Sequence, residues 1–461
     1  MKLKPVSIEV PKGDPFRNDA LDRKESIGFL SKLSADVDPP FVICIDSPWG
    51  TGKSTFLKMW MQYQTADNVE PLYFNSWKTD FADDALVAFV SEVSNLVEAK
   101  IGKLNARHKR VIDNAKRVGS LLARRALPVL GKVATAGALD IEALQEEALA
   151  GLVEQTLKDS ADAYLAEKDL IDQFHVALEE LVNLFSAKDA NARLLLMVDE
   201  LDRCRPPYAI EMLERIKHLF DVPNVVFVLA LDKSQMQTSL EAVYGRGING
   251  AEYLRRFIDL EFSLPPADTR SFTKHLFREF SIPEAFSTRT HGEFQYEEDS
   301  LERTFNELCT LFNMSLRARE QCFTRIRIAM LSTPDDYHIY PILLTALIVL
   351  RTMAPEIYLG YVQDSGSAHL VIKYLLSLPG GEEFINSHSG GVLEALLVGA
   401  RGRLRDESEE LAGYRYVAAE EGADPRVRDR ASFVLEMLKH PSSNPKLHYL
   451  LPKIELVARM R

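Results

Sequence analysis

The residues with the clearest chemical role form a short loop that follows an apolar run over residues 41–46. The loop reads Ser47, Pro48, Trp49, Gly50, Thr51, Gly52, Lys53, Ser54 and Thr55, and a helix-like stretch follows it. Gly50 and Gly52 let a backbone pass close to phosphate oxygens with its N–H groups turned toward them, and a helix N-terminus adds a favourable dipole. In that arrangement Lys53 bridges the outer phosphates of a nucleoside triphosphate, and Ser54 places its hydroxyl on Mg²⁺.

One position departs from the usual spacing of such a loop, G-x-x-x-x-G-K-[ST]. Ser47 stands where the first glycine is usual. Serine fits there if the backbone has a negative φ, so the departure bears on geometry and not on chemistry. The competing interpretation is a glycine-rich turn with an adjacent lysine.

A pair of acids follows a second apolar run, over residues 194–198. Asp199 is expected to hold the hydrated Mg²⁺ shell, because this ion keeps several waters and favours one or two carboxylates. Glu200 is expected to polarise the attacking water, because in-line phosphoryl transfer to water needs an orienting base. The alternative is a strand end with two solvated acids, and the phosphate-binding loop upstream argues against it.

A third apolar run, over residues 225–231, ends at Asp232. Asp232 is expected either to sense the γ-phosphate of the nucleotide or to cap the next helix. No Asn-Lys-x-Asp motif, which recognises guanine, follows a strand-like run. The sequence therefore favours ATP over GTP.

The fold class follows from five short runs that are apolar at both odd and even positions. They cover residues 41–46, 71–75, 194–198, 225–231 and 257–262, with helical stretches between them. Runs of this kind are typical of parallel strands that are covered on both faces. The sequence therefore predicts an α/β domain over residues 1–265, with a largely helical insertion over about 82–191, and a helical C-terminal domain over residues 266–461.

Composition limits the possible classes of function. Hydrophobic residues make up 46% of the 461 residues, which is typical of a folded globular protein. The 67 acidic and 55 basic residues give a net charge of −12, which argues against a protein that coats nucleic acid. The four cysteines lie far apart with no metal-ligand spacing, which indicates a reducing compartment. Because the sequence shows neither an export signal nor a transmembrane span, we expect a cytoplasmic protein.

Taken in order, the motifs resemble those of KAP-type P-loop NTPases over roughly residues 14–265. They are residues 46–55, 74–77, 199–204 with 213–217, 227–232 and 252–254. The resemblance implies an additional-strand (ASCE) P-loop core with sheet order 5-1-4-3-2, and ATP hydrolysis as the activity. It also implies a setting in bacterial defence against phage or plasmids, since such proteins are among the members.

Two features of this chain differ from the family picture. Many members carry transmembrane helices between the second and third strands, whereas here Arg124, Arg125 and Lys132 interrupt the best candidate span. The family often has two aspartates at the end of the third strand, whereas this chain has Asp199 and Glu200. The second difference favours hydrolysis.

Weaker candidates lie beside the acid pair. Arg203 is expected either to contact phosphate or to pair with Asp202 or Glu214. Asn75 and Trp77 lie in one of the motifs that resemble the family, but their residue types suggest no chemical role. Trp77 is expected to pack in the core rather than to stack on a base.

Three further arginines have alternative interpretations. Arg255 and Arg256 are candidates for an arginine finger that reaches a neighbouring subunit, or they mark a solvated helix end. Arg317 is either a lid arginine or a structural residue.

A basic segment over residues 100–132 stands out in this acidic chain. It contains ten basic residues and one acid, Asp113. Its apolar residues recur at helical spacing, so most charges fall on the opposite face. Such a helix binds nucleic acid, binds an anionic membrane surface, or packs against the acidic stretch over residues 140–154.

These observations predict a Mg²⁺-dependent ATPase that acts as a nucleotide-driven switch, in a homo-oligomer or with a defence-system partner protein. Two alternatives stay open. One is a motor stimulated by nucleic acid, and the other is a nucleotide-binding scaffold without useful hydrolysis.

Overall fold

The computed structural model describes most of the chain in two units. The described residues are 9–64, 69–82, 85–101, 105–126, 193–219, 223–265, 268–287, 297–335, 337–363, 367–401, 409–420, 424–440 and 445–455, with isolated positions between them. One unit comprises Val10–Asp19 and Arg23–Pro265, and the other comprises Met1–Glu9, Ala20–Asp22 and Pro266–Arg461. Most of the insertion expected up to residue 191, including Lys132, lies outside the described residues.

The first unit is built on a five-stranded parallel sheet in the order β2-β3-β4-β1-β5. The strands are β1 (Phe41–Asp46), β2 (Val69–Asn75), β3 (Arg193–Asp199), β4 (Val225–Leu231) and β5 (Leu260–Ser263). The predicted parallel sheet is confirmed, and its order is the expected 5-1-4-3-2 counted from the other edge.

The last strand begins three residues later than predicted. Phe257 is buried in the core before the strand starts. Asp259 hydrogen-bonds the β1 edge, since its backbone N–H donates to the Val42 carbonyl at 3.0 Å and its carboxylate accepts from the Val42 N–H at 2.8 Å. The chain therefore joins the sheet through one aspartate before regular pairing begins.

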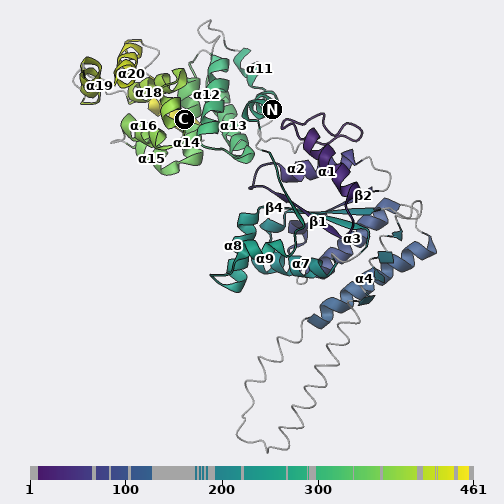
Figure 1. Cartoon of the computed structure of the whole chain (residues 1–461). Helices are drawn as coiled ribbons and strands as arrows, with labels where there is room; N and C mark the ends of the chain where they lie inside the picture. The colour runs from purple at the N-terminus through teal and green to yellow at the C-terminus, as the bar shows by residue number, and fades with distance from the viewer. Residues whose placement is uncertain are drawn as a thin grey trace, which may run out of the picture. The chain divides into compact units, whose positions relative to one another are not determined.

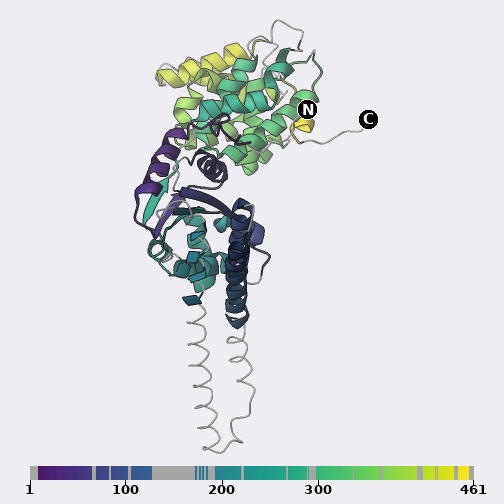
Figure 2. The same ribbon diagram turned by 90° about the vertical axis from the view of Figure 1, so that its right-hand side faces the viewer.

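Helices cover both faces of this sheet, as the two-sided apolar runs require (Figure 1, and turned by 90° in Figure 2). The helices α1 and α2 lie on one face, and α3, α7, α8 and α9 lie on the other. Their bounds are α1 (Lys24–Asp36), α2 (Lys53–Tyr63), α3 (Ala85–Ile101), α7 (Pro206–Leu219), α8 (Lys233–Tyr244) and α9 (Gly250–Arg255). Every residue of β4 is buried, so this strand is fully enclosed between the two layers.

The described part of the insertion is helical. The helix α4 (Ala106–Ala126) packs beside α3. Its apolar side chains Val111, Ile112, Ala115 and Val118 are buried in the same core cluster as the α3 side chains. One face of this helix is thus used by the fold itself.

The second unit is helical throughout its described residues. Its helices are α10 (Thr269–Glu279), α11 (Ile282–Ser287), α12 (Glu297–Leu311), α13 (Leu316–Leu331), α14 (Pro341–Met353), α15 (Pro355–Val362), α16 (Ala368–Ser377), α17 (Gly381–Ile385), α18 (His388–Ala400), α19 (Glu409–Ala419), α20 (Pro425–Met437) and α21 (Leu447–Ile454). The first ten residues of α14 are all buried, and α12, α13, α15, α18 and α21 pack around this helix. Among the described residues, no helix has the length and apolar character needed to cross a membrane.

Candidate nucleotide site

The site forms where the carboxyl ends of four strands meet. Parallel pairing sets Asp46 level with Leu231, and Asn75 level with Asp199. The segments that follow β1, β2, β3 and β4 therefore leave the sheet along one edge. In open α/β sheets this edge is where ligands bind.

The loop after β1 has the backbone that its sequence predicts. Gly50 and Gly52 have φ values of 78° and 93°, a conformation that favours glycine, and Gly52 caps the start of α2. Ser47 is absent from the described residues with positive φ, so the serine in place of the first glycine is not strained. Its hydroxyl bonds the Thr51 hydroxyl at 2.8 Å, and Thr51 bonds the Pro48 carbonyl at 2.8 Å.

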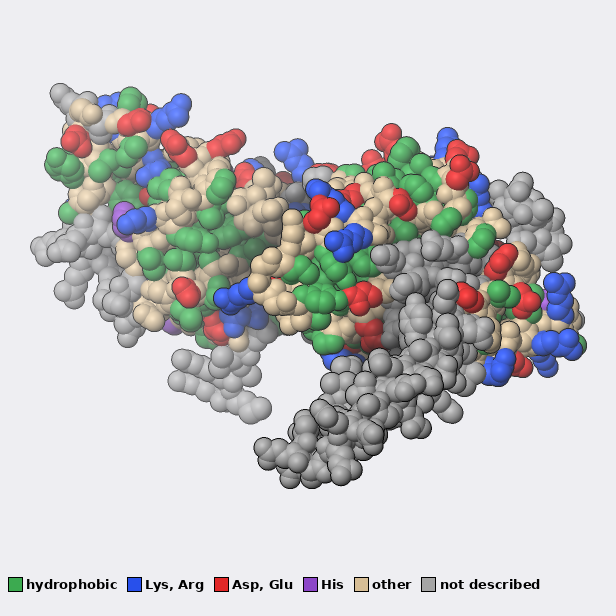
Figure 3. All heavy atoms as spheres, turned by 60° about the horizontal axis from the view of Figure 1, so that its bottom comes forward, with side chains coloured by type: hydrophobic (Ala, Val, Ile, Leu, Met, Phe, Trp, Pro, Cys, Tyr) green, Lys and Arg blue, Asp and Glu red, His purple; other side chains and the backbone are tan. Residues whose placement is uncertain are grey.

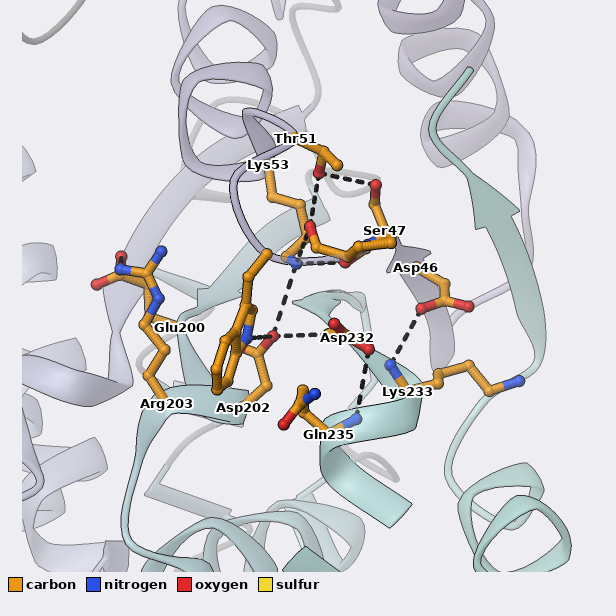
Figure 4. A network of polar contacts seen from close by, with 12 residues as sticks. Asp46, Ser47, Thr51, Lys53, Glu200, Asp202, Arg203, Asp232, Lys233 and Gln235 are labelled. Atoms are coloured by element: carbon orange, nitrogen blue, oxygen red, sulfur yellow. Dashed lines mark hydrogen bonds and ion pairs between the residues drawn. The ribbon is translucent and has the colours of Figure 1, made fainter. Parts of the chain in front are cut away.

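Lys53 lies under this loop and points toward the ends of β3 and β4 (Figure 4). Its ammonium donates to the Ser47 carbonyl and, at 3.2 Å, to the Pro48 carbonyl. It also lies 3.6 Å from the Asp202 carboxylate. The lysine side chain is only 9% exposed, so its charge is directed into the site.

Asp202 is a site residue that the sequence interpretation considered only as a partner for Arg203. Its carboxylate accepts from the Trp49 indole N–H at 2.8 Å and from the Asp232 backbone N–H at 2.7 Å. It thereby ties together the segments that follow β1, β3 and β4. Burial raises the pKa of Asp202, and the nearby Lys53 charge opposes that rise. The sequence signal that could have identified Asp202 as a site residue was its position three residues after Asp199, which ends a strand.

Asp199 ends β3 and is almost completely buried. It accepts from the Tyr73 hydroxyl at 2.6 Å and from the Glu200 N–H at 2.9 Å. Burial raises its pKa, while hydrogen bonds from Tyr73 and Ser54 partly lower it. The structure therefore brings Ser54 and Asp199 together, and a hydroxyl with a carboxylate is a donor set that fits Mg²⁺.

Glu200 has both carboxylate oxygens engaged. The Asn75 amide donates to one oxygen at 2.8 Å, and the Arg203 guanidinium pairs with the other. Figure 4 shows the Glu200 and Arg203 side chains together, to one side of the contact between Lys53 and Asp202. The partner of Arg203 is thus Glu200 and neither of the two acids considered from sequence, because the turn after β3 brings residues 200 and 203 together.

Asn75 has two structural roles that the sequence did not suggest, as a helix cap and as a hydrogen-bond donor to Glu200. It caps the short helix η1 (Ser76–Thr79) by accepting from the Lys78 N–H at 3.0 Å, and its amide group faces Glu200. The same turn buries Ser76 and leaves Trp77 55% exposed. The prediction that Trp77 packs in the core is wrong, and the Arg203 guanidinium lies over its ring at 5.9 Å from the centroid.

Asp232 has the contacts of a helix cap, one of its two predicted roles. Its carboxylate accepts from the Ser234 N–H at 3.0 Å, the Gln235 N–H at 3.3 Å and the Ser234 hydroxyl at 2.6 Å. The side chain is buried at the start of α8.

The remaining arginines lie on surfaces. Arg255 pairs with Glu252 at 2.9 Å on an exposed helix end, and the Arg256 guanidinium lies 5.7 Å from the Tyr253 ring centroid. Arg317 is exposed near the start of α13 in the helical unit. Among their described contacts, none involves the loop after β1.

The burial of Asp199 gives a prediction about pH. Because its pKa is raised in the folded protein, the carboxyl group stabilises the fold at acidic pH, and this contribution is lost as pH rises through the raised pKa. We therefore expect Asp199→Asn to raise the Tm of the ligand-free protein at pH 8 and to abolish Mg²⁺-dependent nucleotide binding. The Tyr73 hydroxyl can reverse its bond to accept from the new amide.

Thermal unfolding and nucleotide titration at pH 8 measure the two effects. Asp113→Asn, at an exposed position on α4, is the matched control and should change neither. In the wild type, Mg²⁺-dependent binding should weaken as pH falls and Asp199 takes up a proton. A variant with lower Tm and unchanged Mg²⁺ dependence would contradict the assignment.

Together these contacts define a P-loop nucleotide site at the carboxyl edge of a parallel sheet. The sequence model of the KAP family P-loop domain matches residues 27–331. The chain therefore belongs to the KAP family of P-loop proteins. The match continues past Pro265 into the helical unit, as far as the end of α13.

Other comparisons are more distant. No curated protein matches the chain. A solved structure of the Aeropyrum pernix ORC1 protein in complex with DNA is 12% identical with a TM-score of 0.34, and the match covers 96% of this chain and 95% of that one. The Aeropyrum pernix ORC2 protein in ADPNP-ADP complexes is also 12% identical, with a TM-score of 0.31 and 94% of each chain covered. Similarity at this level carries no argument about the function of this chain.

Proposed function

We propose that this protein is a Mg²⁺-dependent ATPase whose nucleotide state switches the arrangement of its helical parts. The observation that carries the proposal is the convergence of Lys53, Asp199 and Glu200 on one sheet edge beside a loop with two positive-φ glycines. The absence of a guanine-recognition motif from the sequence supports ATP over GTP. A role in defence against phage or plasmids is proposed from family membership alone.

Each residue has a definite task in this proposal. Lys53 donates to phosphate oxygens, and its present acceptors, two loop carbonyls and Asp202, keep it aimed at the site. Ser54 and Asp199 would hold Mg²⁺, which supplies positive charge to the phosphates when bound. Glu200 takes the proton of the attacking water, since a carboxylate that already accepts two hydrogen bonds still has free lone pairs.

Arg203 acts on Glu200 and is therefore a positioning residue in this proposal, together with Asn75. Arg256 is proposed as a finger toward the nucleotide of a second copy, which its exposed position allows. The direct test is turnover of ATP by the purified protein with Mg²⁺ and with excess EDTA. No phosphate release above background in Mg²⁺ would contradict the proposal.

A specific observation favours a second candidate, an ATPase stimulated by nucleic acid. While the apolar face of α4 is buried, Arg107, Lys109, Arg110 and Arg117 on the same helix are exposed. Lys116 on this helix lies 3.5 Å from the Glu98 carboxylate. Such a face suits phosphate contacts. Elsewhere, on the face drawn in Figure 3, basic and acidic side chains are mixed.

For this candidate we expect DNA to stimulate turnover and salt to weaken DNA binding. Three phosphate contacts predict a loss of about 40-fold in affinity between 50 and 200 mM salt. The triple variant Arg107→Glu, Lys109→Glu, Arg110→Glu should abolish both effects. The control has the same charge change on the exposed face of α10 and consists of Arg270→Glu, Lys274→Glu and Arg278→Glu. Equal loss of DNA binding in the α4 and α10 triple variants would exclude a nucleic-acid-stimulated ATPase, and so would a wild type that binds no DNA.

A further inference from the structure

The helical unit contains a cavity that neither the nucleotide site nor the basic helix uses. It lies between α16, α18, α19 and α20 and has a volume of about 800 Å³. This volume falls in the range of pockets that bind small molecules. Among the pockets found within the described residues, it is larger than its neighbour beside Arg426 and Phe433, which measures about 530 Å³.

The wall of the cavity is largely apolar. Ile372 and Leu376 lie one helical turn apart on α16, and Val417 and Val427 line the cavity from α19 and α20. Leu376 and Val427 are 38% and 39% exposed, so part of this apolar wall is open to solvent. Apolar surface left uncovered at a cavity wall favours a ligand with an apolar body.

A charged group lies buried in the same cavity. Glu394 belongs to α18, a helix that is buried from Ser389 to Ala400, and it is 2% exposed. The Tyr414 hydroxyl donates to its carboxylate at 2.7 Å, and the Arg430 Nε lies 3.2 Å away. Burial raises the pKa of Glu394, while Tyr414 and Arg430 lower it in part. A buried ion pair contributes little to stability on its own, so its position at a cavity calls for another reason.

The charge balance of the lining indicates the sign of the ligand. Arg430 compensates Glu394 through a contact of its Nε, and a guanidinium carries further N–H donors besides that one. Lys373 and His369 lie one turn apart on α16 at the exposed rim, and within the described residues Lys373 has no carboxylate partner. The lining therefore has an excess of positive charge over an apolar wall.

We propose that this cavity binds a small organic anion, with its charged group at Lys373 and Arg430 and its apolar body against Ile372 and Val417. The proposal does not depend on ATP hydrolysis. It assigns a ligand site to the helical unit, separate from the edge of the sheet.

The probe for the test is 8-anilinonaphthalene-1-sulfonate, an aromatic sulfonate that fluoresces in apolar surroundings. N-phenyl-1-naphthylamine has the same rings without the sulfonate and is the matched neutral probe. We expect the wild-type chain of 461 residues to bind the sulfonate at one site, and binding should persist in saturating Mg²⁺ and ATP.

Two variants locate the site. Gly413 lies in α19 on the cavity wall, and a Cβ added there would meet no atom within 4 Å. In Gly413→Phe the aromatic ring is therefore expected to occupy the cavity, and phenylalanine has a better helix propensity than glycine. We expect this variant to bind both probes more than tenfold more weakly than the wild type. Lys373→Ala should weaken the sulfonate about tenfold and leave the neutral probe unchanged. Lys439→Ala, at an exposed position on the same unit, should change neither.

Three results of these binding experiments would overturn the proposal. Unchanged affinity in Gly413→Phe would place the probe elsewhere. Equal weakening of both probes by Lys373→Ala would exclude recognition of the anion, and loss of the signal in ATP would place the probe at the nucleotide loop. Circular dichroism and the Tm of Gly413→Phe show whether this variant keeps its fold.

Discussion

Glu200→Gln is expected to lower kcat for ATP hydrolysis by roughly 10²- to 10⁴-fold and to leave the affinity for ATP unchanged, because a general base contributes about that factor. The amide keeps the size of the side chain but cannot take a proton from water. Since the carboxylate is held between Asn75 and Arg203 and not by the phosphate-binding loop, the substitution should leave nucleotide binding intact.

Turnover under saturating Mg²⁺ and ATP, with a separate titration of nucleotide, measures both parts of this prediction. Glu252→Gln is the matched control, because Glu252 is exposed and pairs with Arg255 far along the chain from the acid pair. Equal and negligible turnover in wild type and Glu200→Gln, with ATP bound by both, would favour a nucleotide-binding scaffold over an ATPase.

The parts of the site that the sequence predicted are those coded by neighbouring residues. The loop from Ser47 to Thr55 contains its own glycines, lysine and hydroxyls, and the acid pair directly follows an apolar strand. Parallel strands that are buried on both faces show little alternation of apolar and polar residues. Their short apolar runs therefore made the sheet predictable from the sequence. The two edge strands, β2 and β5, are less completely buried than the three central strands, and their starts were misplaced by two and three residues.

The contacts that the sequence did not reveal join residues far apart in the chain. Asn75 and Glu200 are separated by 125 positions, and Trp49 and Asp202 by 153. No local pattern encodes such a pair, because it depends on the order and register of the strands. Trp77 was misjudged for a related reason, since one turn of η1 decides which of two adjacent side chains faces the core.

Lys53→Ala is expected to weaken ATP binding by roughly 10- to 100-fold, the loss of one charge-assisted hydrogen bond to phosphate. It should also destabilise the protein without ligand, because Asp202 is 1% exposed on its side chain and would lose its nearest cation. We expect that cost to be on the order of 1–3 kcal/mol, since the Trp49 and Asp232 N–H groups still hold the carboxylate.

A double variant separates these two effects. Adding Asp202→Asn removes the uncompensated charge, so Lys53→Ala with Asp202→Asn should regain much of the lost Tm while ATP affinity stays low. Lys58→Ala, at an exposed position on the same helix, is the control and should change neither quantity. If the double variant recovered nucleotide affinity together with stability, Lys53 would act by holding Asp202 in place and not by contacting phosphate.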